Sequence, residues 1–359
     1  MKNYKVGIIG ATGMVGQRFM TLLENHPWFT VTHLIASARN KGKTYEEAIE
    51  GRWKLDTPIP EAMKKMVLLD ADADAEEIAK AVDFVFCAVD MNKEDVKALE
   101  ERYAKLECPV MSNNSAHRHT PDVPMIIPEI NAAHAEIIPA QKKRLGTKRG
   151  FIAVKSNCSI QSYVPALTAI WDYGIKEVAV CTYQAISGAG KTFETWPEMI
   201  DNIIPYIGGE EEKSEIEPMK IWGKVEGDRI VPATSPVITA QCLRVPASNG
   251  HMAAAFVKLE KKATKEEIIN RWKNFKGRAQ ELNLPSAPEY YLTYFEEDNR
   301  PQTKLDRDLY HGMGVSIGRL REDPIYDYKF VSLSHNTIRG AAGGAVLMAE
   351  LLCAEGYID

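Results

Sequence analysis

The beginning of the chain has the pattern of a short strand, a glycine-rich turn and a helix. Residues 4–9 are an apolar run, residues 10–16 are Gly-Ala-Thr-Gly-Met-Val-Gly, and a helical pattern continues to Leu23. Glycines at this spacing allow close approach of the backbone to a pyrophosphate, which the N–H groups at the helix start can bind. We therefore expect a doubly wound parallel sheet that binds a dinucleotide. The alternative is a turn that only lets the helix pack on the sheet.

The composition of the 359 residues is that of a folded protein long enough for two domains. Hydrophobic residues make up 45% and charged residues 26%, which argues against a disordered chain. The net charge of -5 gives no reason to expect nucleic acid, and no apolar run approaches the length of about 20 residues that crosses a membrane. The six cysteines form no CxxC pair, and residues 1–5 lead into a strand, so we expect a cytoplasmic protein without a zinc site.

The first half of the chain continues the alternation of strands and helices. Apolar runs at residues 31–36 and 81–89 are predicted strands of the same sheet. An NAD-binding protein of this architecture usually has an Asp or Glu after its second strand, where it binds the ribose hydroxyls. Here the basic loop 37–43 follows, which favours a 2′-phosphate and hence NADP, with Ser37 and Arg39 as the predicted phosphate contacts. Ordinary solvated charges are the alternative.

Cys158 lies where a strand-like run gives way to a helix-like run. Residues 151–154 are apolar, residues 156–160 are Ser-Asn-Cys-Ser-Ile, and a helical pattern follows over 161–171. A thiol at a helix N-terminus has a lowered pKa, because the unpaired N–H groups there stabilise the thiolate. The same N–H groups can bind an oxyanion on the carbon that the sulfur attacks. Taken alone, Cys158 has the alternative interpretation of a small buried hydrophobic residue.

The second half of the chain has longer predicted strands with charged or proline-containing connections. These strands are predicted at residues 178–185, 237–245, 252–259, 314–320 and 330–333. The pattern is typical of a mixed, largely antiparallel sheet. We therefore expect an α/β chain with a nucleotide-binding domain at residues 1–157 and an α+β domain at residues 158–336.

Three groups of residues in the second half can meet the thiol. They are Gln184 with the small-residue loop 187–190, Glu210 with Lys213 in an acidic run, and Arg244 with His251 on either side of a turn. Each group has an ordinary alternative as part of a strand, a surface ion pair, a helix start or a turn. Their occurrence together with a dinucleotide motif describes a Cys–His acyl-transfer site beside a hydride carrier.

The polar segment 113–128 contains Arg118 between two histidines. A guanidinium binds phosphate in a bidentate manner, so Arg118 is a candidate anion-binding residue. His117 and His119 alternate as metal ligands sometimes do, but the sequence suggests no third ligand nearby, and we predict no metal site.

Ordered motifs along nearly the whole chain resemble the aspartate-β-semialdehyde dehydrogenases of archaea, fungi and some bacteria. These motifs lie at residues 10–16, 156–159, 184–188, 204–213, 244–246 with 250–251, and 336–343. The resemblance implies a Rossmann-type domain and a catalytic and oligomerisation domain, as in the glyceraldehyde-phosphate-dehydrogenase fold. It implies NADPH-dependent reduction of L-aspartyl 4-phosphate to L-aspartate 4-semialdehyde with release of phosphate, toward lysine, threonine and methionine, by a homodimer or homotetramer.

The resemblance also implies roles for individual residues. Cys158 would form a thioester, His251 would act as general acid and base near its ordinary pKa of about 6.5, and Gln184 would orient the substrate. The implied substrate-binding residues are Arg244 for the α-carboxylate, Glu210 for the ammonium group, and Arg118, Asn157 and Lys213 for the phosphate. The predicted cofactor contacts are Gly10, Thr12, Gly13, Met14, Val15, Ser37, Arg39, Ser187, Gly188 and Asn336.

The end of the chain is predicted to be a helix that returns to the first domain. Apolar residues from Ile338 to Ala349 are spaced as one face of a helix, just after Asn336. Residues 337–359 would then complete the nucleotide-binding domain, and the cofactor would bind in the crevice between the domains.

Other functions remain open from the residues alone. Related reductases of this fold act on malonyl-CoA or on N-acetyl-γ-glutamyl phosphate, and a silent NADP-binding regulator is an alternative from another class. Glu210 argues for a substrate with a free ammonium group. Cys158 together with His251 argues against a silent protein, which has no chemical need for either residue.

Overall fold

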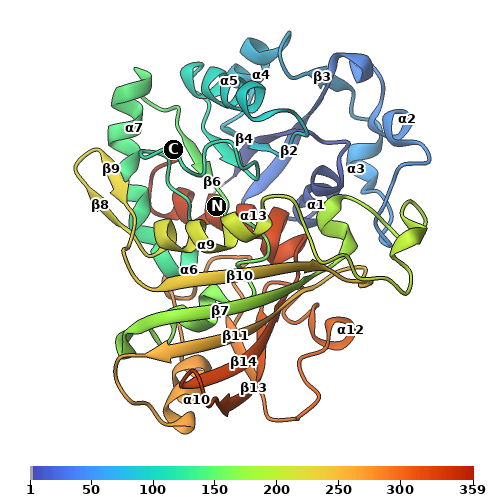
Figure 1. Cartoon of the computed structure of the whole chain (residues 1–359). Coiled ribbons are helices and arrows are strands. Elements are labelled where there is room, and N and C mark those ends of the chain that lie inside the picture. Colours follow the sequence, from blue (N-terminus) through green and yellow to red (C-terminus); the bar gives the residue numbers. More distant parts are fainter. Residues whose placement is uncertain (1–2) are drawn as a thin grey trace.

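The computed structural model describes residues 3–359; Met1 and Lys2, part of the N-terminal segment considered above, lie outside the described residues. Over this range the chain forms two six-stranded sheets and a two-stranded hairpin. Figure 1 shows the first sheet and its helices, blue to green, in the upper half of the molecule, and the second sheet in the lower half.

The first sheet is parallel throughout. Its strands are β1 (Tyr4–Ile9), β2 (Phe29–Ala36), β3 (Leu68–Asp70), β4 (Phe84–Cys87), β5 (Val110–Ser112) and β6 (Ile152–Val154). They lie in the order β3-β2-β1-β4-β5-β6, and every neighbouring pair is parallel. This is the doubly wound order of dinucleotide-binding domains, so the predicted fold class of the first half is confirmed.

Helices cover both faces of the first sheet. They are α1 (Met14–Leu23), α2 (Tyr45–Ile49), α3 (Glu61–Lys64), α4 (Ala75–Ala81), α5 (Lys93–Lys105), α6 (Pro128–Asn131) and α7 (Ile138–Leu145), with 3₁₀ turns η1 (Ala38–Asn40) and η2 (Ala132–Ile137). All four residues of β4 are buried. A parallel strand covered on both faces reads as a continuous apolar run, which is why the sequence identified it.

The second sheet is mixed, as predicted. Its strands are β7 (Ile175–Gln184), β10 (Val237–Arg244), β11 (His251–Leu259), β12 (Leu292–Phe295), β13 (Val315–Glu322) and β14 (Tyr328–Ser334). The order is β10-β7-β11-β14-β13-β12, with parallel pairs at the two edges and antiparallel pairs between them. Along β11 buried and half-buried residues alternate strictly, so one face packs on the core and the other stays accessible.

The remaining elements are short or lie between the sheets. They are α8 (Val164–Thr168), η3 (Trp171–Tyr173), η4 (Ile186–Ala189), η5 (Pro197–Met199), α9 (Glu210–Ile221), the hairpin β8 (Lys224–Glu226) and β9 (Arg229–Val231), α10 (Lys265–Lys273), α11 (Arg278–Glu281), α12 (Thr303–Asp306), a π-helical segment η6 (Ile338–Ala342) and α13 (Gly343–Ala354). Figure 1 shows α9 and α13 near the boundary of the two halves.

The segment after Cys158 differs from the prediction. Residues 159–163 are turns, and the helix α8 begins only at Val164 and spans five residues. Pro165 stands in its first turn, where proline is tolerated, and the helix ends at Thr168. The prediction of a continuous helix over residues 161–171 was therefore wrong. Cys158 lies in a turn several residues before α8.

The C-terminal helix returns to the first half of the chain, but not as a one-faced helix. Every residue of α13 from Gly343 to Cys353 is buried, and α13 contacts β5 and α6. The hydroxyl of Tyr4 lies 3.4 Å from the carbonyl oxygen of Ile358, so both ends of the described chain meet at the first sheet. A helix that is apolar all round is a buried helix, which the one-face prediction did not anticipate. The predicted domain boundary at residues 157 and 158 stays a prediction.

Candidate active site

The glycine-rich turn between β1 and α1 is closely packed against the backbone. Gly10 has φ +88°, and a Cβ atom there would lie 2.2 Å from the carbonyl oxygen of Ala88. A Cβ on Gly16 would lie 2.2 Å from the carbonyl oxygen of Gly10. Gly13 precedes α1 and gives it no side-chain cap, so the first N–H groups of α1 remain available to an anion.

A cleft of about 180 Å³ opens beside this turn, and it joins segments that are far apart in the sequence. It is lined by residues that include Met14, Arg18, Lys54, Ser187, Arg307 and Thr337. Met14 and Ser187 are predicted cofactor contacts. Arg18 Nε is buried and has no hydrogen-bond partner among the described residues, and its guanidinium belongs to the wall of the cleft. An accessible helix start and a guanidinium whose buried Nε has no hydrogen-bond partner among the described residues fit the diphosphate of a dinucleotide.

The other predicted cofactor contacts occupy two different environments. Ser37 and Arg39 are exposed, at and just after the end of β2. Asn336 is buried instead: its Nδ2 donates to Ser187 Oγ at 2.9 Å and its Oδ1 accepts from the Gly250 N–H at 2.8 Å. Asn336 thus fixes the loop of Ser187 and the turn before His251, and its contact with a nicotinamide amide stays a prediction.

Arg244 and His251 meet at Gly188. They end β10 and begin β11, and a Cβ placed on Gly188 would lie 3.0 Å from both Arg244 Nη1 and His251 Nε2. Arg244 Nη1 also donates to the carbonyl oxygen of Ala185 at 2.7 Å. The structure therefore brings together a fixed cation, an imidazole and a small-residue loop, as the sequence predicted for these positions.

Cys158 interacts electrostatically with Arg244 of this group. It is partly exposed, and a Cβ on Gly340 of η6 would lie 2.9 Å from Cys158 Cβ. Burial raises the pKa of the Cys158 thiol above its ordinary value, and Glu210 raises it further. Lys155, Arg118 and Arg244 act in the opposite direction. The prediction that a helix N-terminus lowers this pKa was wrong, because no helix begins at Cys158 and the effect of burial exceeds that of the neighbouring cations.

His251 is neutral in this environment. Burial, and next to it Arg244, lowers the pKa of His251 to about 3, only partly opposed by Glu210 and the Gly250 backbone. Nδ1 accepts a hydrogen bond of 3.0 Å from the Ala185 N–H, so the proton of the neutral ring is on Nε2. Nε2 is buried and has no hydrogen-bond partner among the described residues. His251 is thus set to donate a hydrogen bond from Nε2–H, and the pKa near 6.5 expected for it was wrong.

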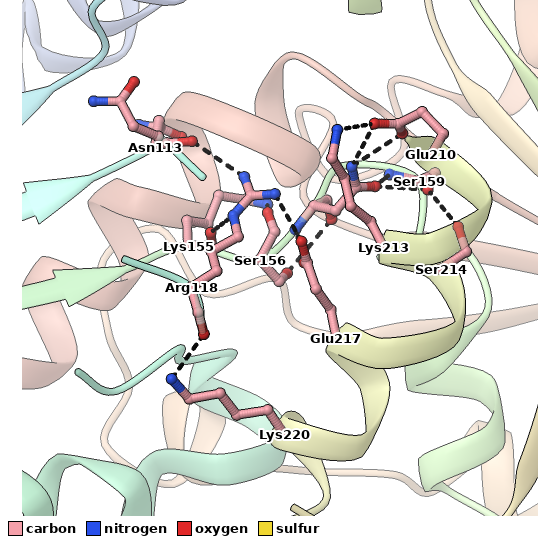
Figure 2. Close-up of polar contacts among 12 residues, drawn as sticks. Asn113, Arg118, Lys155, Ser156, Ser159, Glu210, Lys213, Ser214, Glu217 and Lys220 are labelled. Atoms are coloured by element: carbon pink, nitrogen blue, oxygen red, sulfur yellow. Dashed lines mark hydrogen bonds and ion pairs between the residues drawn. The ribbon is translucent and has the colours of Figure 1, made fainter. Parts of the chain in front are cut away.

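Glu210 is the centre of a second cluster (Figure 2). Its carboxylate accepts hydrogen bonds from Asn157 Nδ2 at 3.0 Å, Gln184 Nε2 at 3.2 Å and Lys213 Nζ at 2.7 Å. Burial alone would raise its pKa, but Lys213 and these amide donors hold the pKa below its ordinary value. Four residues that the sequence proposed as catalytic or substrate-binding are therefore in direct contact.

Arg118 is held by partners that the sequence did not indicate. Its Nη1 lies 3.0 Å from Glu217 Oε1, its Nε donates to the carbonyl oxygen of Lys155 at 2.9 Å, and its Nη2 donates to that of Asn113 at 3.2 Å. The second carboxylate oxygen of Glu217 accepts from the Asn157 N–H at 2.6 Å. Glu217 thus links Arg118 to the segment of Cys158 (Figure 2).

Two residues of the site, Lys155 and Glu217, were not predicted from the sequence. Glu217 lies seven residues after Glu210, so both face the same side of α9, and helical periodicity would have found it. Lys155 is 2% exposed, directly after the buried strand β6. The sequence feature that could have identified Lys155 is its place at the end of an apolar run, three residues before Cys158.

Between residues 3 and 359, no group of three or more His, Cys, Asp or Glu side chains lies close enough together to hold a metal ion. None of the helices in this range is long and apolar enough to cross a membrane.

Comparisons with known proteins agree with the geometry. Residues 5–138 match the family described as semialdehyde dehydrogenase, NAD binding domain, and residues 167–339 match the semialdehyde dehydrogenase dimerisation domain. The aspartate-semialdehyde dehydrogenase of Methanothermobacter thermautotrophicus is 41% identical over 350 residues, which are 97% of this chain and 98% of that protein. That of Aspergillus fumigatus is 39% identical over 99% of this chain and 98% of its own length.

A solved structure extends the comparison to the fold. The crystal structure of aspartate-semialdehyde dehydrogenase with NADP from Candida albicans has a TM-score of 0.89 and 35% identity, covering 99% of this chain and 100% of that one. Sequence and fold thus match over nearly the whole length. The chain belongs to the aspartate-semialdehyde dehydrogenase family of oxidoreductases.

Proposed function

We propose that the chain reduces L-aspartyl 4-phosphate to L-aspartate 4-semialdehyde and phosphate, with NADPH and through a thioester on Cys158, in lysine, threonine and methionine biosynthesis. The name and the full-length similarity of the relatives support this reaction. The observation that carries the mechanism is the convergence of Arg244 and His251 at Gly188, with Cys158 electrostatically coupled to Arg244. A nucleophile, a proton donor and an anion-binding cation are the groups that acyl transfer from a phosphate requires.

In the proposed reaction the thiolate of Cys158 attacks the acyl carbon and phosphate leaves. NADPH, when bound, supplies the hydride that reduces the acyl group. His251 donates a hydrogen bond from Nε2–H to the oxygen that becomes negative as the carbon is attacked or reduced, because Nδ1 is engaged by the Ala185 N–H. Gly188 leaves space for the acyl group between Arg244 and His251.

The substrate-binding roles rest on charge. Arg244 binds the α-carboxylate, since its guanidinium has a backbone carbonyl as hydrogen-bond partner and keeps further donors. Glu210 binds the ammonium group of the substrate. In the structure its carboxylate is paired with the ammonium group of Lys213. Lys213, Asn157 and Arg118 then bind the phosphate, and Gln184 orients the acyl group. Arg118 would bind the phosphate through the guanidinium N–H groups that its ion pair with Glu217 does not use.

The cofactor of the proposed reaction is NADP(H). The match to an NAD binding domain and the Candida relative crystallised with NADP support a nicotinamide dinucleotide. The preference for the 2′-phosphate rests on Ser37 and Arg39, which are exposed where β2 ends. Gly10, Thr12, Gly13, Met14 and Val15 would hold the diphosphate; Ser187, Gly188 and Asn336 would adjoin the nicotinamide.

We infer that the chain forms a homodimer or homotetramer through the accessible face of the second sheet. Half-buried Ala179, Cys181 and Phe256 line a groove of about 260 Å³ there, and half-buried Ala254 is the strand partner of Cys181. The match to a dimerisation domain supports this inference. A cytoplasmic location agrees with the cysteines, none of which forms a disulfide within the described residues.

The test is phosphate-dependent reduction of NADP by aspartate semialdehyde, followed by absorbance. We expect turnover that requires phosphate, prefers NADP to NAD and disappears in Cys158→Ala, while the variant still binds NADPH. Phosphate-independent turnover, or full activity of Cys158→Ala, would refute the mechanism. Comparable activity with malonyl-CoA would refute the substrate, because malonyl-CoA has no ammonium group for Glu210.

A further inference from the structure

Lys155 is an unusual lysine, because it is buried with little to compensate its charge. It is 2% exposed, and its Nζ donates one hydrogen bond, of 3.1 Å, to the carbonyl oxygen of Ser156. An ammonium group has three donors. Burial lowers the pKa of Lys155 to about 7, which Arg118 and Arg339 assist and Cys158 and Glu217 oppose.

A second buried lysine shows what a structural role looks like in this fold. Lys220 on α9 donates to the carbonyl oxygens of Arg118, Thr120 and Val123 at 2.7, 2.8 and 2.8 Å. All three of its donors are satisfied, and the bonds tie α9 to the segment of Arg118 (Figure 2). Lys155 ties no two segments together in this way, so a purely structural role does not explain why a charged side chain is buried at this position.

The neighbours of Lys155 suggest a reason for a buried lysine at this position. Gly344, at the start of α13, approaches so closely that a Cβ there would lie 2.6 Å from Lys155 Cε, and Gly340 of the preceding turn packs on Cys158 in the same way. Lys155 and Cys158 are therefore enclosed by consecutive turns of one segment. A helix N-terminus is electropositive, which makes this an expensive place for an ammonium group unless a negative charge forms nearby.

The charged groups around Cys158 leave Lys155 as the available cation. Arg118 is paired with Glu217, and Arg244 is coupled to Glu210 as well as to Cys158. The negative charge of Glu210 disfavours the thiolate, and Lys213 is already paired with Glu210. His251 is neutral and carries its proton on Nε2, so it offers no lone pair to the thiol. The thiolate needs a counter-ion more than it needs a base, since Cys158 is partly exposed and the thiol can release its proton to water.

We propose that Lys155 is the counter-ion of the Cys158 thiolate, and hence a positioning residue that sets the reactivity of this cysteine. The S–H bond breaks, the proton passes to solvent, and the protonated Nζ of Lys155 balances the charge left on sulfur. The importance of this role for turnover rests on the proposed function, in which Cys158 is the nucleophile. The electrostatic role itself can be measured without any substrate.

The test compares Lys155→Met with Lys220→Met, which also removes a buried ammonium but one that does not act on Cys158. Alkylation of Cys158 by iodoacetamide is followed from pH 5 to 10 by mass spectrometry of the peptide that contains it. We expect Lys155→Met to raise the midpoint of the alkylation profile by about one unit and to slow the reaction at neutral pH about tenfold. Lys220→Met should leave the midpoint unchanged, and Lys155→Arg should restore part of it.

Two outcomes would overturn the proposal. One is an unchanged midpoint in a folded Lys155→Met variant, and the other is an equal shift in Lys220→Met. If Lys155→Met does not fold, the reciprocal effect is measured in the wild-type chain: carbamidomethylation of Cys158 should lower the Lys155 pKa observed by NMR of its Nζ, and no change would refute the coupling. Full activity of Cys158→Ala would refute the proposed function and leave these measurements valid.

Discussion

The Ala185 N–H donates its hydrogen bond to Nδ1 of His251, and this single contact decides what the imidazole can do. A protonated ring would carry a hydrogen on Nδ1 and point it at another hydrogen. Burial and the neighbouring Arg244 act in the same direction and bring the pKa of His251 to about 3. Residue type alone suggests a histidine that titrates near neutral pH, whereas this histidine stays neutral and presents Nε2–H.

The low pKa makes His251 a source of acid sensitivity. The folded state binds this proton with a pKa of about 3 and the unfolded chain with about 6.5, so the unfolded state takes up the proton first as the pH falls. The contribution of His251 to the free energy of unfolding is fully present above pH 6.5 and is lost as the pH falls toward 3. We expect the wild-type free energy of unfolding to fall between pH 6.5 and 4.5 by about 2–3 kcal/mol more than that of His251→Gln.

Urea unfolding of both proteins across this pH range measures the difference. His335, whose pKa is also lowered to about 3 by burial and by Arg18 and Arg307, is retained in both proteins, so both pH dependences include its titration. Parallel pH dependences would show that His251 is not neutral and buried in the folded state.

At the scale of one element, α9 carries the largest share of the site. Glu210, Lys213, Ser214, Glu217 and Lys220 follow its length on one side (Figure 2). The sequence indicated Glu210 and Lys213 through the acidic run, and the resemblance implied their roles. The roles of Glu217 and Lys220 depend on contacts with residues about a hundred positions away. Such contacts form only when α9 packs against the first half of the chain.

Glu217→Ala is expected to destabilise the protein by about 3–5 kcal/mol, because it leaves Arg118 buried without its anion and the Asn157 N–H without an acceptor. Chemical unfolding measures this change. The matched control is Glu212→Ala, which removes an exposed carboxylate of the same helix and should change stability by less than about 0.5 kcal/mol. A loss of similar size in both variants would contradict the role of the buried pair.

At the scale of the whole molecule, the second sheet has one face committed to the core and one accessible face. Val178, Val180, Ala253 and Ala255 belong to the core, while Cys181, Ala254 and Phe256 are half-buried. An apolar, accessible sheet face next to the active-site strands is what a second copy of the chain would cover.

Ala254→Arg is expected to weaken this association. The substitution places a charged side chain in the middle of the accessible face, and a buried, unpaired charge opposes an interface. Light scattering after size exclusion should show a shift toward the monomer at micromolar concentration, with the melting temperature measured in parallel. Thr30→Arg on the exposed residue of β2 is the control and should leave the assembly unchanged. An unaltered mass for Ala254→Arg would exclude this face as the interface.

The sequence by itself determined the family, the doubly wound order of the first half and the mixed sheet of the second. These depend on local signals: apolar strands, glycines at fixed spacing and ordered motifs. Tertiary structure alone decided the protonation of His251, the partners of Arg118 and the burial of Lys155. Those properties arise from burial and from charges brought together across long sequence distances, and neither is encoded in local periodicity. The turn at Cys158, read from sequence as a helix start, shows the same limit, because tertiary packing overrides a short helical pattern.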